Sequence, residues 1–186
     1  MFWVLKIKSK LFCLIPRSIS IFLGKLIGYF LYYLIPLRKK VAMKNLKISF
    51  PNKSKNELNQ ILKKCYIHFG VIISDFLRLP LLNEKTIDGI LALDKKTNRL
   101  LNENSPSIIM TGHIGNWELF LPVLGYNNYK ASGVAQVQRN KNGEKFFNWI
   151  RSSKNTRIIS KGNSFKSINE VLEKKYHLVL VSDQNA

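Results

Sequence analysis

The residues best suited to chemistry lie in one short stretch, 111–119, which reads TGHIGNWEL. It holds a histidine, His113, and an acid, Glu118, with four residues between them. An imidazole held by a carboxylate is a general base, because the acid fixes the tautomer and stabilises the imidazolium that forms. Such a base removes a proton from a substrate hydroxyl, which then attacks an activated acyl carbon. The pair predicts acyl transfer to an alcohol, with His113 and Glu118 as catalytic residues.

The spacing by itself is a weak signal, since a histidine and an acid four residues apart arise by chance in many proteins. The competing interpretation is a loop histidine that caps nearby backbone. The context favours chemistry, because Gly112 and Gly115 let the chain turn tightly and approach a ligand. Asn116 suits the N-cap of the helix that follows. His68 and His177 have no acid at the same spacing.

Other reaction types find no matching motif. The sequence lacks a G-x-S-x-G elbow, a P-loop, a G-x-G-x-x-G loop and an H-E-x-x-H helix. The two cysteines, Cys13 and Cys65, are far apart and belong to no metal-binding cluster. We therefore expect no metal and no other cofactor, and direct transfer to the hydroxyl without a covalent enzyme intermediate.

The periodicity predicts the elements that position this stretch. Ser54 and Glu57 form a capping box that starts a long helix, which ends before Pro80. Strands then alternate with helices, which is typical of a mostly parallel sheet flanked by helices, an α/β fold. The predicted strands are 107–111, 132–137, 156–160 and 178–182, and the predicted helices are 117–124, 143–152 and 164–174.

Such sheets bind ligands beyond the carboxyl ends of their strands. His113 follows the first predicted strand, and polar residues follow the other three. We therefore expect four groups along the carboxyl edge of the sheet: the base His113, the cations Arg139 and Lys161, and the carboxylate of Asp183. The substrate-binding candidates are Gly115, Asn116, Arg139, Lys161, Asp183 and Gln184.

The N-terminal region predicts contact with lipid. Between Pro16 and Pro36 only Arg17 and Lys25 are charged, and a helix of this length reaches ~28 Å, barely the thickness of the hydrocarbon layer. The segment is expected either to span a bilayer as a transmembrane helix or to lie in its interface. A signal peptide is the competing interpretation, but basic residues follow the apolar run where a small-x-small cleavage site would stand. We expect a membrane-anchoring segment over 1–37 and a catalytic domain over 38–186.

The charge predicts an anionic partner. Lys and Arg number 30 against 11 Asp and Glu, a net charge of +19. An AT-biased coding sequence would explain part of this excess. Nucleic acid, an anionic membrane surface and an acidic protein or substrate all fit the rest. No nucleic-acid-binding signature is present, and the apolar N-terminus favours lipid, so we expect no nucleic acid partner. The denser basic cluster after the apolar segment favours a cytoplasmic catalytic domain.

The stretch TGHIGNWEL resembles the signature of the lipid A late acyltransferases, the lauroyl/myristoyl transferase family of Gram-negative bacteria. In that family H-x₄-[DE] commonly stands within T-G-H-x-G-N-W-E. Two further segments agree: 45–51 (NLKISFP) resembles the family's N-[IL]-x₃-F-P, and 178–184 (LVLVSDQ) resembles its strand ending in Asp-Gln. Arg139 and Arg151 fall near arginine positions of the family. The resemblance covers residue 37 to the end.

The resemblance implies a fold like that of the glycerolipid acyltransferases and a place on the bacterial inner membrane, facing the cytoplasm. The activity implied is transfer of a fatty acyl chain from acyl carrier protein to a hydroxyl of a lipid A precursor, in lipopolysaccharide biosynthesis. His113 would be the base, Glu118 its orienting partner and Arg151 a further substrate-binding residue. Acyl carrier protein is acidic and lipid A precursors are phosphorylated, so both suit a basic enzyme.

Two alternatives stay open. In the first, the protein is an acyltransferase whose acceptor is another membrane lipid, a lysophospholipid or a glycolipid. In the second, the chain is an inactive remnant that only binds the membrane. The second arises because the family continues past Asp-Gln with a glycine-containing segment, whereas this sequence ends at Ala186. A C-terminal truncation is therefore expected.

Overall fold

The computed structural model describes residues 1–87 and 93–183. The chain forms two compact units, which are described separately. One contains Met1–Lys10 with Leu79–Ala186, and the other contains Leu11–Arg78. The division expected at residue 37 concerns membrane anchoring, which stays a prediction.

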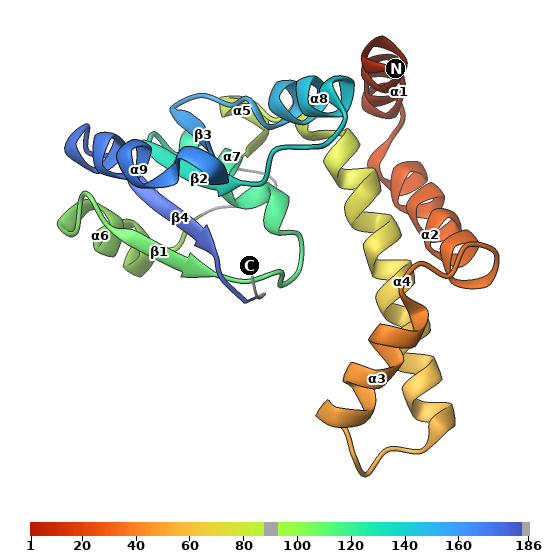
Figure 1. The fold of residues 1–186 in the computed structure, drawn as a ribbon. Helices are drawn as coiled ribbons and strands as arrows, with labels where there is room; N and C mark the ends of the chain where they lie inside the picture. Colours follow the sequence, from red (N-terminus) through yellow and green to blue (C-terminus); the bar gives the residue numbers. More distant parts are fainter. Residues whose placement is uncertain (88–92, 184–186) are drawn as a thin grey trace. The chain divides into compact units, whose positions relative to one another are not determined.

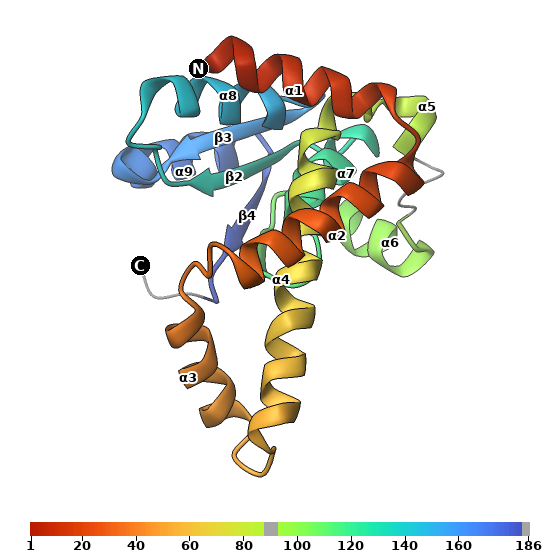
Figure 2. The same ribbon diagram turned by 90° about the vertical axis from the view of Figure 1, so that its right-hand side faces the viewer.

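The unit Leu11–Arg78 is helical. It contains the end of α1 (Phe2–Leu14), then α2 (Arg17–Tyr33), α3 (Lys39–Ser49) and α4 (Lys55–Leu77). In both views α2 runs alongside α4, and α3 lies beside the first turns of α4 (Figures 1 and 2).

Small residues let α2 and α4 approach closely. Ser20, Gly24 and Gly28 are the buried residues of α2. A Cβ atom added at Gly28 would lie 2.4 Å from the Cα of Ile67, so a larger residue there has no room. The hydroxyls of Ser20 and Ser74 lie 2.5 Å apart across the same contact. The small-residue ridge on the N-terminal helix therefore packs against another helix.

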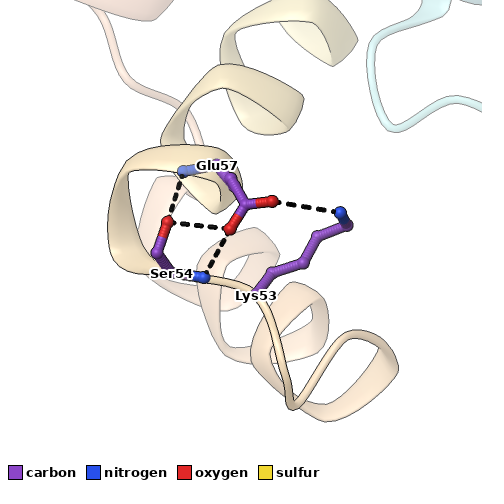
Figure 3. A network of polar contacts seen from close by, with 3 residues as sticks. All are labelled: Lys53, Ser54 and Glu57. Atoms are coloured by element: carbon purple, nitrogen blue, oxygen red, sulfur yellow. Dashed lines mark hydrogen bonds and ion pairs between the residues drawn. The ribbon is translucent and has the colours of Figure 1, made fainter.

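The capping box predicted at the start of α4 is confirmed (Figure 3). The backbone N–H of Glu57 donates to Ser54 Oγ at 3.3 Å, and the backbone N–H of Ser54 donates to Glu57 Oε2 at 2.8 Å. Lys53 adds an ion pair to the same carboxylate at 3.3 Å. These contacts satisfy two backbone donors that a helix start otherwise leaves unpaired.

Within residues 1–87 and 93–183, no helix has both the length and the apolar character needed to cross a membrane. The transmembrane helix expected between Pro16 and Pro36 therefore has no support. The helix observed there is α2.

The other unit is an α/β layer structure, as predicted. Its four strands are all parallel in the order β1-β4-β2-β3 (Figure 1). The strands are β1 (Ile108–Thr111), β2 (Ala131–Ala135), β3 (Thr156–Ser160) and β4 (His177–Val181). The helical segments are η1 (Leu79–Leu81), α5 (Glu84–Ile87), α6 (Lys95–Glu103), η2 (Trp117–Leu119), α7 (Phe120–Tyr126), α8 (Lys141–Arg151), η3 (Lys161–Asn163) and α9 (Ser164–Glu173).

Helices cover both faces of this sheet. Neighbouring residues of β4 point to opposite sides of the sheet, so their contacts identify the helices on each face. Val179 packs with Leu101 of α6 and Leu124 of α7. Leu178 packs on the other side with Val171 of α9. The central strands are thus buried on both faces, which explains why β4 reads as a continuous apolar run.

A buried histidine at the start of β4 makes stability depend on pH. His177 is 2% exposed, its Nδ1 lies 2.8 Å from Ser107 Oγ, and burial lowers its pKa. In the unfolded chain the pKa is about 6.5, so on acidification the unfolded state takes up the proton first. The free energy of unfolding that depends on a neutral His177 is therefore fully present above about pH 6.5. It is lost as the pH falls through the pKa of His177 in the folded state. We expect urea unfolding to give a smaller free energy at pH 5 than at pH 7.

His177→Gln keeps a hydrogen-bonding partner for Ser107 and is expected to weaken this pH dependence. His68→Gln is the control, because His68 is exposed on α4 and should leave the pH dependence unchanged. If the free energy of unfolding of the His177→Gln variant depended on pH as strongly as that of the native chain, His177 would not be the source of the pH dependence.

Candidate active site

The loops after β1 and β4 bring an imidazole and a carboxylate together. His113 and Asp183 each stand two positions beyond the end of their strands, and these strands are neighbours in the sheet. His113 Nδ1 lies 2.7 Å from Asp183 Oδ1, and the backbone N–H of His113 donates to Asp183 Oδ2 at 2.8 Å. One carboxylate therefore holds both the ring and the backbone of His113.

The hydrogen bonds define the protonation of this pair. They lower the pKa of Asp183, with the side-chain bond from His113 as the largest cause and the backbone bond from His113 next. An ionised carboxylate only accepts hydrogen bonds, so Nδ1 of His113 carries the hydrogen and Nε2 is the basic nitrogen of the neutral ring. Nε2 makes no hydrogen bond to any residue that the structure describes. The side chain of His113 is 33% exposed, so part of the ring is open to solvent.

Two glycines shape the loop, as predicted. A Cβ atom at Gly112 would lie 3.1 Å from the carboxylate carbon of Asp183, so glycine allows the acid to approach. Gly115 has φ +59°, in the left-handed region that glycine adopts without strain. The indole of Trp117 then meets the His113 ring edge-on, with 4.7 Å between the ring centroids.

Glu118 has a different partner. Both of its oxygens accept from Arg151 at the end of α8, Oε2 from Nε at 2.9 Å and Oε1 from Nη2 at 2.6 Å. The two side chains are 13% and 22% exposed, so the pair is largely shielded from water. The structure thus places Asp183 beside the imidazole, and it joins Glu118 to a guanidinium. The catalytic role of Glu118 and the substrate-binding role of Arg151 stay predictions.

Loss of this ion pair is expected to destabilise the protein. Arg151→Met removes the partner of a poorly hydrated carboxylate, and breaking such a pair costs about 3 kcal/mol. Lys174→Met is the matched control, because its pair with Glu170 is about half-exposed and such pairs contribute about 0.5 kcal/mol. Urea unfolding measures both variants, and equal losses would contradict the importance of the shielded pair.

Asn116 occupies the N-cap position of η2, as predicted, but its side chain makes no capping hydrogen bond. Its amide nitrogen and oxygen are both buried, with no partner among the described residues. Burying an amide in this way costs about 1–3 kcal/mol, so this side chain is a destabilising feature in the loop that follows His113.

The remaining predicted site residues follow other strands. Arg139 is exposed in the loop after β2, and Lys161 is exposed at the start of η3, directly after β3. Parallel strands place both at the same edge of the sheet as His113. Gln184 lies outside the described residues. The substrate-binding roles of all these residues stay predictions.

The site combines a partly exposed imidazole, a carboxylate that orients it and cations that follow other strands at the same edge of the sheet. This set suits proton removal from a hydroxyl. In the part of the chain that the structure describes, no three His, Cys, Asp or Glu side chains come together as a metal site.

Comparison with protein families matches residues 1–186 to a family model described as bacterial lipid A biosynthesis acyltransferase. Comparison with curated proteins gives no match. The family match covers the whole chain, including the loop with His113 and the strand before Asp183. The chain therefore belongs to the bacterial lipid A biosynthesis acyltransferase family.

Proposed function

We propose that this protein transfers a fatty acyl chain from acyl carrier protein to a hydroxyl of a lipid A precursor, with His113 as the general base. The observation that carries this proposal is the imidazole held by Asp183 through ring and backbone at the carboxyl edge of the sheet. Membership of the family supports an acyl transfer and an acceptor of the lipid A type.

The reaction follows from the orientation of the ring. Nε2 takes the proton of the acceptor hydroxyl while the oxygen attacks the carbonyl carbon of the acyl thioester. The tetrahedral intermediate then collapses, the carbon–sulfur bond breaks, and the sulfur leaves as a thiol with the proton from the imidazolium. Asp183 stabilises the imidazolium between these steps, because its negative charge lies against Nδ1.

Glu118 has a positioning role in this mechanism. It lies in the segment directly after the His113 loop, and its bidentate bond to Arg151 ties that segment to the end of α8. The pair holds the loop in place while His113 moves the proton. Glu118 thus acts through the loop geometry, whereas Asp183 acts on the imidazole itself.

The charge of the protein suits both substrates and their location. A net charge of +19 attracts acidic acyl carrier protein and the phosphates of the lipid acceptor, which raises the rate of encounter. The proposed location is the bacterial inner membrane, with the catalytic unit facing the cytoplasm.

The direct test is an assay with radiolabelled acyl-acyl carrier protein and a lipid A precursor in detergent micelles. We expect a labelled lipid A species with the native chain and none above background with His113→Ala. A parallel reaction with lysophospholipid tests the other acceptor class. Label only in the lysophospholipid would overturn the lipid A assignment, and no labelled lipid at all would overturn acyl transfer.

A further inference from the structure

We infer that α2 lies in the plane of an anionic bilayer surface and inserts one face into the interface between headgroups and acyl chains. This face, called the outer face below, falls within an arc of about 100° at 3.6 residues per turn. It consists of Ile19, Phe22, Leu26, Tyr29, Phe30 and Tyr33.

The packing inside the helical unit fixes which way this face points. The buried ridge Ser20, Gly24 and Gly28 lies opposite the outer face on the helical wheel. Its contact with α4 is backbone to backbone, since a Cβ at Gly24 would lie 2.9 Å from the carbonyl oxygen of Gly70. The helix cannot rotate about its axis without losing this fit, so Phe22, Leu26 and Phe30 stay turned away from α4. Lys63 of α4 reaches the other side of the outer face, where its Nζ lies 5.2 Å from the ring centroid of Tyr29 and 5.3 Å from that of Tyr33.

The outer face is too exposed and too apolar for contact with water alone. Phe22 and Tyr33 are each 60% exposed and Phe30 is 50% exposed. Single exposed apolar residues are common, whereas a continuous apolar strip is typical of an interaction surface. No charged residue falls inside the arc, and Lys25 lies at its border.

The charge of the helical unit selects the partner. Residues 11–78 contain twelve Lys or Arg and two Asp or Glu. Both acids are already in ion pairs, Asp75 with Arg17 and Glu57 with Lys53. An apolar strip on a strongly basic unit fits an anionic lipid surface, where the strip enters the interface and the cations meet the headgroups.

Helix α1 has the same amphipathic design. Its exposed apolar residues also fall within one arc of about 100°, with Lys8 and Lys10 on either side. Long basic side chains beside an apolar strip can reach the headgroups while their stems stay in the apolar layer. The strip consists of Trp3, Val4, Ile7, Leu11 and Leu14.

A nucleic acid is disfavoured as the partner. Binding single strands requires cations interleaved with the aromatic rings, because each base stacks while its phosphate is neutralised. On the outer face Lys63 of α4 lies over Tyr29 and Tyr33. The rest of the face consists of aliphatic and phenyl side chains, which suit acyl chains better than phosphates: Ile19, Phe22, Leu26 and Phe30. Lipid binding refines the membrane location proposed above and requires no acyl transfer, so it can be tested without substrates.

Flotation with vesicles tests the surface. The full chain is mixed with phosphatidylcholine vesicles containing phosphatidylglycerol, then separated on a density gradient at low and high salt. We expect the native chain to float at both salts, and the double variant Phe22→Ser/Phe30→Ser to bind at least about tenfold more weakly. Phe165→Ser is the matched control, because Phe165 is 80% exposed on α9 and should leave binding unchanged.

Equal binding of the double variant and the native chain would overturn the proposal, as would release of the native chain by salt alone. Circular dichroism shows whether the double variant keeps its helices. If the double variant loses its helices, the membrane contact of α2 is tested instead by the single-cysteine labelling described next, which leaves Phe22 and Phe30 in place.

Depth measurements decide the orientation. Ile19, Leu26 and Tyr33 are replaced singly by cysteine in a chain with Cys13→Ser and Cys65→Ser, and each carries a fluorophore quenched by lipids brominated at different depths. An in-plane helix places all three labels at the same depth. A spanning helix would separate the first from the last by about 21 Å along the membrane normal, and that result, or no quenching at any position, would overturn the inference.

Discussion

His113→Ala is expected to lower the turnover number by about 10²–10⁴-fold, the contribution of a positioned general base. The variant keeps Asp183 and the loop glycines but has no nitrogen to accept the hydroxyl proton. Its stability is expected to change little, because the side chain is one-third exposed. Turnover of labelled acyl-acyl carrier protein measures the rate, and urea unfolding measures the stability.

His68→Ala is the control for that experiment, because His68 is exposed on α4 and is not part of the sheet edge. It should keep native turnover. Near-normal turnover of the His113→Ala variant would remove His113 from the mechanism.

Asp183→Asn is expected to lower turnover by about 10²-fold, a larger loss than that of Glu118→Gln. The amide still fits beside His113, but it has no charge to stabilise the imidazolium. Glu118→Gln keeps one oxygen as an acceptor for Arg151, so its main effect should be on stability. The same turnover and unfolding assays separate the two acids.

The conservative variants sharpen this comparison. Asp183→Glu retains a carboxylate and is expected to recover part of the turnover that Asp183→Asn loses. If Glu118→Gln abolishes turnover at native stability while Asp183→Asn is nearly normal, the imidazole is steered by Glu118, and the mechanism proposed for Asp183 is wrong.

Much of the fold follows from local patterns. The capping box of Ser54 and Glu57 involves residues three positions apart, so the pattern specifies both partners. The four strands appear at the short apolar segments that predict them, with bounds that differ by at most two residues. Gly115 adopts the left-handed backbone that a tight turn requires.

The partner of the imidazole does not follow from local patterns. Glu118 is the acid nearest to His113 in the sequence with suitable spacing, and the sequence therefore favours it. Asp183 is seventy positions away and meets His113 because β4 is inserted beside β1. Strand order depends on how the whole chain packs, and no feature of the His113 loop encodes it.

The sequence by itself determined the motif, the types of the elements and the basic charge, because these depend on residue identity and short-range spacing. The tertiary structure decided which acid holds His113, which cation holds Glu118, and which face of α2 is covered by α4. Each of these contacts joins residues distant in the chain, so each depends on the packing of strands and helices that local periodicity leaves open.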